Sequence, residues 1–541
     1  MSRFLPVTLT LSLLVGVLSG LTVAGFDELM TLSLNMILDQ RLAVVMVVPP
    51  LGLCLVALIS HLRRDDDTAT TDAYVRAYHQ RGGRMSIAAA WPRVLGSAIT
   101  LGTGNAFGFE GPSILIGGTI GSTLDERFGL RLRRDDAKIL MVAGAAAGVA
   151  AVFKAPLTGV VFALEVPYRS DLARRALLPS LVAAGSAYVT FVTLMGTAPL
   201  LPTGGSAPFD LRDLGGGLIL GLACGVLARL GARAMELAKS LPLPRVGRVL
   251  IGTCVLVAIA PLGQWWFGGP FHLGPSYEAI EWAISPGRSA GVLAGLFVVR
   301  AIATWCGVAA GGMGGLFIPL VTQGAIIGAL VQQFVNVPNA YLFPTIGIAA
   351  MLGAGYRTPL AGVAFVAEAT GQPGFLIPAF IAAAASQFTM GPRSFSPYQR
   401  SERSPEIGPL THLAVSEIMS PNADTVAGDM PLDQALTAMM RQNRRWAPVV
   451  VEGTYVGLIA VTDIAAVTTS DWPALNVVDV ARNDVAAVSP DTTLTTAAKR
   501  MRSQGTGALA VTENGRVIGV VTERDLSNVE VLLDHLANPT D

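Results

Sequence analysis

The chain has 541 residues, of which 52% are hydrophobic and only 14% are charged, and its mean hydropathy is +0.54. Soluble globular chains carry about 25% charged residues, so this composition excludes an ordinary soluble protein and indicates an integral membrane protein. The net charge of zero and the pI of about 7.0 exclude the basic surface that nucleic-acid binding requires.

The cysteines and histidines are scattered along the chain. No CxxC pair or other metal-ligand spacing occurs among the cysteines, which stand in or beside apolar stretches. We therefore expect small core cysteines and no metal site. The residues concerned are Cys54, Cys224, Cys254, Cys306, His61, His79, His272, His412 and His535.

Residues 1 to about 400 alternate long apolar stretches with short polar breaks. The first stretch is typical of a signal peptide or of a first membrane helix, and its length favours the helix. Segments 111–121 and 316–331 are too short or too glycine-rich to cross a bilayer, so they predict helices that begin or end inside it. The clear spans are 42–60, 139–166, 175–195, 216–235, 247–266, 289–309, 341–369 and 375–390.

An internal repeat organises this part of the chain. GFEGPSILIGGTIG (108–121) matches GLFIPLVTQGAIIG (315–328), and FKAPLTGVVFALE (153–165) matches YRTPLAGVAFVAE (356–368). Two halves with matching broken segments predict a transporter or channel whose site lies where the halves meet, near the membrane midplane. The matched pairs include Gly108 with Gly315, Pro112 with Pro319, Lys154 with Arg357, Pro156 with Pro359 and Glu165 with Glu368.

Glu110 stands in the first repeated segment. Gly108 and Gly111 permit close approach of the backbone to a ligand, and Pro112 suits the first turn of a helix. We expect a helix whose free N–H groups and dipole form a positive site, with a second such helix start at GLFIP. A carboxylate there competes with a permeating anion. Because burying a charge in the membrane costs about 2.5–3.5 kcal/mol, we interpret Glu110 as a gate rather than a simple helix cap.

The sequence changes character after Met390. Residues 391–410 are rich in Ser, Pro and Arg, as in a linker at the membrane face. From Val415 short β-branched runs alternate with amphipathic helical stretches. This tail also repeats itself, for example Val449 with Val511. Neither unit is large enough to bury much core alone, so we expect the two to pack on each other.

GFEGP resembles the GREGP signature of the CLC chloride channel and transporter family, GLFIP resembles its GxFxP signature, and the tail resembles a pair of CBS domains. The resemblance implies a mainly α-helical, polytopic membrane domain over 1–400, made of inverted halves at about 1–200 and 205–400. It also implies a linker over 401–414 and α/β CBS domains at 415–475 and 476–535. It further implies a homodimer with one anion pathway in each subunit, gated by Glu110. The implied anion-binding backbone is at Gly108, Phe109, Gly111, Leu316, Phe317 and Ile318.

The chain departs from the family pattern at two places before Glu110. The arginine of GREGP is Phe109 here, which removes a positive charge. The family's GSGIP serine, which touches the anion, falls in DDDTATTDAYV (65–75). Thr68, Thr70 or Thr71 can supply a hydroxyl there, with a solvated loop as the structural alternative; we favour Thr70.

The family's second anion-touching hydroxyl belongs to a tyrosine near the end of the membrane domain. Tyr398 is the only tyrosine in that region, although an ungapped match falls on Phe395 or Ser396. We expect Tyr398 to supply this hydroxyl, and an interfacial tyrosine is the alternative.

The position of a second glutamate decides between two modes of transport. Proton-coupled members of the family carry it at the end of a GxLFxxEE-like stretch, and the resemblance places Val166 there. Valine cannot relay a proton, so we predict a chloride channel without obligatory proton coupling, and a proton/chloride antiporter is the alternative. The preceding Glu165 has a mate, Glu368, and this favours a structural role, with Lys154 or Arg357 as candidate partners.

GVVTERD (519–525) resembles the GxxTxxD stretch with which CBS pairs hold a ribose. Thr522 and Asp525 are therefore candidates for binding an adenine nucleotide, and the alternative is that the tail only supports dimer packing or gate coupling. The first unit has Ala460 where Thr522 stands, so it is the weaker candidate.

Two other classes of protein fit less well. A magnesium transporter with CBS domains needs converging oxygen ligands, whereas this membrane half offers paired Gly-Pro helix starts and few acids. An intramembrane enzyme needs a nucleophile with its base, or metal ligands, and no GxSxG stretch or histidine cluster occurs. We therefore predict no enzymatic activity and a multi-pass protein of the cell membrane, with small inorganic anions as cargo and the CBS pair in the cytoplasm.

Overall fold

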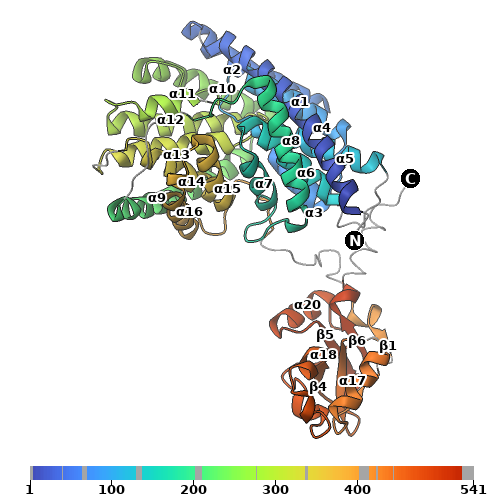
Figure 1. Ribbon diagram of the computed structural model, residues 1–541. Helices are drawn as coiled ribbons and strands as arrows, with labels where there is room; N and C mark the ends of the chain where they lie inside the picture. The colour runs from blue at the N-terminus through green and yellow to red at the C-terminus, as the bar shows by residue number, and fades with distance from the viewer. Residues whose placement is uncertain are drawn as a thin grey trace. The chain divides into compact units, whose positions relative to one another are not determined.

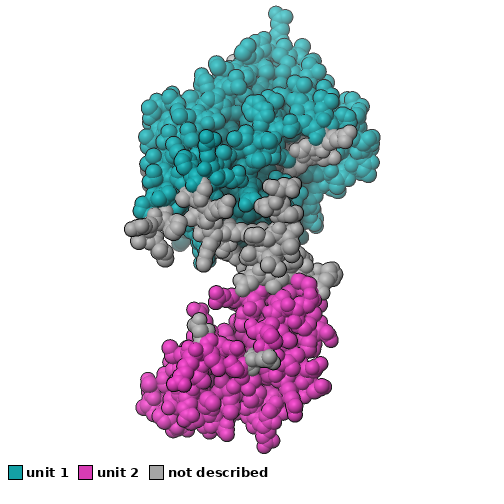
Figure 2. Space-filling view, turned by 90° about the vertical axis from the view of Figure 1, so that its right-hand side faces the viewer, with its two compact units in different colours: residues 1–402 teal, residues 403–541 magenta. Residues whose placement is uncertain are grey.

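The computed structural model describes residues 4–38, 40–63, 70–128, 137–201, 210–275, 277–335, 339–400, 413–421, 424–442 and 444–526. The chain forms two compact units, residues 1–402 and 403–541, which Figure 2 colours separately. The first unit is built of helices and the second carries the strands (Figure 1).

Unit 1 contains several helices too short to cross a bilayer beside longer ones. In the described ranges, α1, α2, α8, α9, α10 and α12 lie in segments long and apolar enough to span a membrane. The helices are α1 (Phe4–Leu38), α2 (Leu42–Arg63), α3 (Thr70–Gln80), α4 (Ile87–Gly102), α5 (Glu110–Arg127), α6 (Ala137–Phe153), α7 (Pro156–Glu165), η1 (Arg174–Ala176), α8 (Leu177–Met195), α9 (Leu211–Ser240), α10 (Arg245–Leu262), η2 (Gly263–Phe267), α11 (Tyr277–Ile284), α12 (Ala290–Ala309), α13 (Phe317–Gln332), α14 (Leu342–Tyr356), α15 (Pro359–Thr370), η3 (Pro373–Phe375) and α16 (Leu376–Met390).

Two segments predicted as continuous spans are each broken into two helices. Segment 139–166 forms α6 and α7, and segment 341–369 forms α14 and α15. Lys154 and Arg357 adopt left-handed backbone angles, with φ of 50° and 55°, which end α6 and α14. Pro156 and Pro359 then begin the next helices, where a proline costs no hydrogen bond. The repeat thus has the same break at matching positions.

The short helices of each half pack through glycine pairs. A Cβ on Gly117 would overlap the carbonyl of Gly144, and one on Gly144 would overlap the carbonyl of Gly117. Gly324 and Gly347 stand in the same relation in the second half. Small residues let helix backbones approach closely in membranes. Close packing of α5 on α6 and of α13 on α14 therefore holds the starts of α5 and α13 inside the unit.

Glu165, the last residue of α7, caps the start of α15. Its carboxylate accepts hydrogen bonds from the N–H groups of Leu360 (3.2 Å) and Ala361 (3.0 Å). The first N–H groups of a helix have no partner within it, so the carboxylate supplies one. This contact joins the two halves of unit 1.

Glu368, the mate of Glu165, makes the reciprocal contact. It accepts hydrogen bonds from the N–H groups of Leu157 (2.8 Å) and Thr158 (2.7 Å) at the start of α7, and from the Thr158 hydroxyl (2.7 Å). The two glutamates therefore have the structural role expected of them. Their partners are main-chain groups and a hydroxyl, however, and the expected cations bind elsewhere: Lys154 donates to the Ala198 carbonyl and Arg357 to the Gly391 carbonyl.

Unit 2 contains two three-stranded sheets, in the strand orders β2-β3-β4 and β1-β6-β5. Val426 pairs in parallel with Val449, and Val488 pairs in parallel with Val511, so the two sequence repeats of unit 2 have the same strand register. The elements are η4 (Val415–Glu417), β1 (Ser420–Pro421), β2 (Val426–Ala427), α17 (Leu432–Arg441), β3 (Trp446–Val451), β4 (Thr454–Ala460), α18 (Val461–Ala465), η5 (Thr469–Asp471), α19 (Val477–Val480), α20 (Leu494–Ser503), β5 (Ala508–Glu513) and β6 (Arg516–Thr522).

Tyr455 ties the two repeats of unit 2 together. Its N–H donates to the Gly515 carbonyl (3.0 Å), and its hydroxyl donates to the Val485 carbonyl (2.9 Å). Burial, with a smaller contribution from the Asp484 carboxylate, raises the pKa of Tyr455 to about 12, so the hydroxyl stays a donor at neutral pH. The repeats pack on each other, as their small size predicts.

Candidate functional site

The two repeated motifs of unit 1 meet in space. The Gly108 N–H donates to the Gly315 carbonyl (2.8 Å), and the Gly315 N–H donates to the Gly108 carbonyl (2.9 Å), which makes an isolated antiparallel bridge. Helix α5 begins two residues later at Glu110, and α13 begins two residues later at Phe317. The starts of two helices from different halves therefore lie side by side in the interior of the unit.

The Glu110 carboxylate occupies the point between these helix starts. The residue is fully buried, and its Oε1 accepts a hydrogen bond of 2.5 Å from the N–H of Phe317. The N–H groups of Ile318 and of Glu110 itself also act on the carboxylate. Within the described ranges its second oxygen has no hydrogen-bond partner. An anion held by the same N–H groups would have to displace this side chain.

The glycines around Glu110 are required by its position. A Cβ at Gly108 or Gly315 would overlap the Glu110 carboxylate, and a Cβ at Gly111 would overlap the hydroxyl of Thr70. Residues without side chains therefore leave the space in which the carboxylate, or an anion in its place, sits. This explains why one acid is flanked by glycine on both sides.

Two of the three candidate threonines lie within the described residues, and Thr68 does not. Thr70, the first residue of α3, donates to the Gly314 carbonyl (3.0 Å) and lies against Gly111. Thr71 is also buried and is next to the hydroxyl of Tyr356. Thr70 therefore places its hydroxyl against the paired glycine segments, and Thr71 places its hydroxyl beside Tyr356.

Aromatic rings from both halves surround the start of α13. The ring centroid of Phe317 lies 4.5 Å from that of Phe153, 5.2 Å from that of Phe162 and 5.1 Å from that of Phe365. All four rings are buried. This cluster fixes the N–H of Phe317 against the carboxylate and excludes water from that side.

Tyr356 is a site residue that the sequence motifs did not indicate. It ends α14, is buried, and its hydroxyl lies next to Thr71 and the main chain of Leu316, in electrostatic contact with Glu110. The repeat contains the one signal that could have revealed it, because Tyr356 aligns with Phe153 and differs from it by a hydroxyl.

Tyr398 is not brought to Glu110 by this arrangement. Its ring is 40% exposed and carries the guanidinium of Arg76 at 4.7 Å from its centroid. The buried hydroxyl of this segment belongs to Ser396, which the ungapped match also reached, and it donates to Asp72 Oδ1 (2.6 Å). Ser394, Phe395 and Ser396 are buried in succession, and the chain then turns at Pro397 and Tyr398, which are both exposed.

Val166, at the position of the family's proton glutamate, is fully buried. The side-chain amide of Gln399 donates to the carbonyl of Val166 (2.8 Å) and to the carbonyl of Tyr356 (2.7 Å). Val166 is therefore close to the Tyr356 end of the site, and its own side chain cannot titrate.

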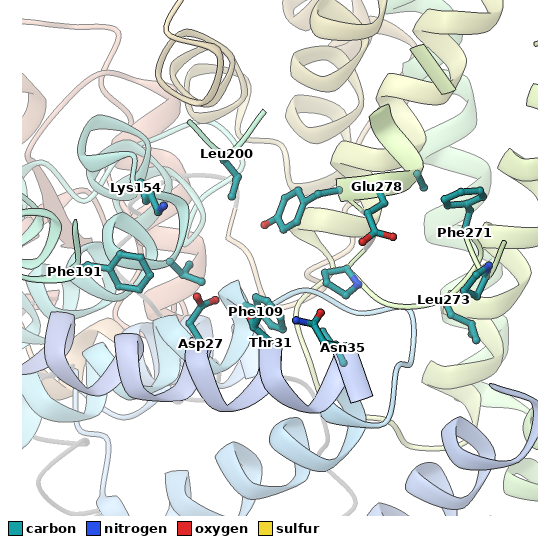
Figure 3. Close-up of a pocket in the computed structure, with 16 residues that line it drawn as sticks. Asp27, Thr31, Asn35, Phe109, Lys154, Phe191, Leu200, Phe271, Leu273 and Glu278 are labelled. Carbon is teal, nitrogen blue, oxygen red and sulfur yellow. The ribbon is translucent and has the colours of Figure 1, made fainter. Parts of the chain in front are cut away.

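A cavity of about 280 Å³ adjoins the residue before the gate, Phe109. Asp27, on α1, and Glu278, on α11, line it together with Lys154. Figure 3 shows Asp27 on one side, Glu278 across from it and Lys154 at one end. Tyr277 lines the same cavity and is in electrostatic contact with Glu110. The cavity therefore lies next to the Glu110 segment and carries the charged groups of Asp27, Lys154 and Glu278.

Thr522 and Asp525 lie together in unit 2. Asp525 Oδ2 accepts hydrogen bonds from the Thr522 N–H (2.9 Å) and hydroxyl (2.7 Å), and Asp463 makes the equivalent contact with the Ala460 N–H (2.9 Å). Each aspartate therefore caps the chain after the last strand of its repeat. The two candidate nucleotide-binding residues are adjacent but already engaged with each other.

Comparisons with known proteins cover both units. The family model for the voltage gated chloride channel matches residues 51–391, and the CBS domain model matches residues 415–468 and 477–531. The H(+)/Cl(-) exchange transporter ClcA of Salmonella paratyphi A (strain ATCC 9150 / SARB42) is 29% identical over an alignment of 318 residues that covers 54% of this chain. The match spans 64% of that relative's length, a little less than two thirds.

Solved structures show the same fold. A CLC-type fluoride/proton antiporter superposes with a TM-score of 0.64 at 22% identity, covering 74% of this chain and 100% of that one. A slow cyanobacterial Cl⁻/H⁺ antiporter gives a TM-score of 0.62 at 22% identity, over 71% of this chain and 94% of that one. A eukaryotic CLC transporter gives 0.63 at 18% identity, over 96% and 98%. These likenesses establish the fold of the chain.

Proposed function

The chain belongs to the voltage-gated chloride channel (CLC) family and carries a CBS pair, and from this premise we propose that it passes small inorganic anions through the Glu110 site. The observation that carries the proposal is the Glu110 carboxylate held by the N–H groups at the start of α13. Membership in this family removes the magnesium-transporter alternative. Chloride is the cargo we expect first, because it is the family default.

The mechanism follows from competition for one set of donors. N–H groups at two helix starts, with their dipoles, attract a monovalent anion without holding it behind a full positive charge. The Glu110 carboxylate satisfies these groups when no anion is present. Protonation of Glu110, or its displacement by an incoming anion, frees them. The closed arrangement described above is then one state of a gate.

We propose that conduction is not obligatorily coupled to protons, because Val166 is buried and cannot titrate. The second candidate is proton/chloride exchange. It is favoured by the relatives, since the ClcA match and two of the structural neighbours are named as proton-coupled transporters. Both modes use the same gate and differ in whether proton movement accompanies each anion.

Liposome flux recorded with chloride and pH electrodes together separates the modes. A channel gives chloride efflux with no uphill proton movement, whereas an exchanger gives protons moved in a fixed ratio to chloride. Glu110→Gln tests the gate itself: the neutral side chain should remove most of the pH dependence of chloride flux. A Glu110→Gln protein with the pH profile of the native protein contradicts the gate.

We further propose that the protein is a homodimer of the cell membrane with its CBS pair in the cytoplasm. A hollow on α15 and α16, lined by Leu360, Phe380 and Phe388 among others, is apolar and open, and a second copy fits its chemistry. Cross-linking of the purified protein in detergent tests the dimer. A monomer at all concentrations contradicts it.

We also propose that Thr522 and Asp525 bind an adenine nucleotide. Their close contact suits a site where a carboxylate accepts from ribose hydroxyls. Thermal unfolding of residues 412–541 with ATP, ADP and AMP tests it, with Asp525→Asn as the comparison. No shift at millimolar nucleotide rejects the idea and leaves the tail with a packing or coupling role.

A further inference from the structure

Asp72 is a second buried carboxylate close to the anion pathway. It lies in the first turn of α3, two residues after Thr70, and is only 4% exposed. Its Oδ1 accepts the hydroxyl of Ser396 (2.6 Å), and its Oδ2 lies 3.7 Å from the Nζ of Lys239, near the end of α9. The Lys239 side chain is 38% exposed, so this end of the cluster reaches water.

Tyr356 lies between the two carboxylates. Its buried hydroxyl is in electrostatic contact with Glu110 and with Asp72, and it adjoins Thr71, the residue before Asp72. Buried polar side chains thus lead from the gate, through Tyr356 and Thr71, to Asp72, and then to Lys239 and water. Protons move along such chains of hydroxyl and carboxyl groups.

The same cluster adjoins the position where the family places its proton glutamate. Gln399 holds the carbonyls of Val166 and Tyr356 together, and Ser396 is three residues before it. The family's acidic side chain is missing at Val166, while Asp72 supplies an acidic side chain that interacts with Tyr356. Residues 391–400 are also the last described part of unit 1 before the CBS pair.

We propose that Asp72 is a proton-binding site at the end of the anion pathway where Lys239 reaches water, in the role that Val166 cannot fill. The proposal rests on the Glu110 pathway being the anion pathway, but not on either mode of transport. A proton from bulk water binds the Asp72 carboxylate and leaves by the same route or through Tyr356 toward Glu110.

The neighbouring charges set the effect of protonation. The groups that act on Asp72 are Lys239 from α9, Ser396 from the segment after α16 and Tyr356 from α14, and Glu110 of α5 acts on Tyr356. Ionised Asp72 repels an anion that approaches from this side and pairs with Lys239. Protonated Asp72 removes the repulsion and frees the ammonium group of Lys239 to attract an anion. Acidification on this side should therefore raise anion flux.

The decisive experiment removes the titration of the gate first. Chloride flux from liposomes is measured between pH 4.5 and 7.5, with the same pH on both sides, for Glu110→Gln and for Glu110→Gln/Asp72→Asn. The single variant should keep a residual rise in flux toward low pH, and the double variant should show a flat, high flux. A single variant without residual pH dependence, or a double variant with an unchanged profile, overturns the proposal.

Three further variants, made in the Glu110→Gln background, test the proposal without replacing Asp72, in case Asp72→Asn does not fold. Lys239→Met removes the positive neighbour and should move the midpoint of the residual pH dependence upward by about 1 pH unit or more; an unmoved midpoint counts against the proposal. Ser396→Ala should move it in the same direction by less. Asp213→Asn is the matched control, because Asp213 is equally buried but caps the opposite end of α9; its profile should not change.

The outcomes also separate this proposal from the function proposed above. Proton movement coupled to chloride, and lost in Asp72→Asn, supports Asp72 and rejects the uncoupled mode. If Glu110→Gln leaves flux unaltered when Asp72 is native, the gate fails, whatever Asp72 does.

Discussion

The two halves of unit 1 share their backbone design and differ in their chemistry. Each half has the glycine before a helix start, the left-handed residue that breaks a span, and the glutamate that caps the opposite half. At the site itself the mates differ: Glu110 aligns with Phe317, and Phe153 aligns with Tyr356. The features that match between the halves form the backbone of the pocket, and the side chains that differ determine its chemistry.

Crowding the duplicated glycines should have the largest effect on transport. A methyl group at Gly315 overlaps the Glu110 carboxylate and fills the space that an anion would take in its place, so Gly315→Ala should lower chloride flux at neutral pH by more than about tenfold, which corresponds to ~1.4 kcal/mol. The pH dependence of flux should fall at the same time. Gly291→Ala is the control, because nothing lies within 4 Å of its added Cβ. A folded Gly315→Ala protein with native flux contradicts the placement of the carboxylate.

The two capping glutamates offer a test on stability. Glu368 serves three donors at 2.7–2.8 Å, whereas Glu165 serves two at 3.0–3.2 Å. Each donor left without a partner costs about 1 kcal/mol or more. Glu368→Ala should therefore lower the free energy of unfolding by about 3 kcal/mol and Glu165→Ala by about 2 kcal/mol. Thermal unfolding in detergent measures the order, and a reversed order would show that burial outweighs the number of bonds.

Sequence alone predicted the parts of unit 1 that the repeat duplicates. Paired Gly-Pro motifs located the starts of α5 and α13, because few other residues allow so close an approach. A charged residue and a proline mark both breaks, at Lys154 and Pro156 and at Arg357 and Pro359, but the apolar residues on either side give each segment the length of a single span. The spans 139–166 and 341–369 were therefore predicted as continuous.

The side chains that close the site were harder to predict. Tyr356 and Asp72 reach the site because α3 begins there and α14 ends there, which depends on tertiary packing and not on a local pattern. Tyr398 was chosen as the only tyrosine of its region, yet the segment turns its ring outward against Arg76. Composition identifies which residue types are present, but the direction of an irregular segment decides which of them face inward.

Replacing Tyr356 by phenylalanine, the residue at the matching position of the first half, should change chloride flux by a smaller factor. Tyr356→Phe makes this position equal to its mate Phe153 and removes one hydroxyl beside the pathway. A hydrogen bond of this kind is worth about 0.5–1.5 kcal/mol, so chloride flux should fall by roughly threefold to tenfold. Tyr168→Phe is the control, since its hydroxyl pairs with Tyr78 instead (3.2 Å). Equal effects of the two variants would remove Tyr356 from the pathway.

The smallest effect on chloride flux should come from replacing Lys154 or Arg357, the two cationic residues with left-handed backbone angles. Lys154 lines the cavity beside Phe109, whereas Arg357 donates to the carbonyl of Gly391. Lys154→Met should lower chloride flux a few-fold at low salt, by reducing the local anion concentration, and the loss should fade toward 1 M salt as the charge is screened. Arg357→Met should lower thermal stability and leave that salt dependence unchanged, because its guanidinium serves the fold. If Lys154→Met instead lowers flux equally at every salt concentration, the Lys154 charge does not attract anions at a distance. Lys154 and Arg357 then both serve to stabilise the fold.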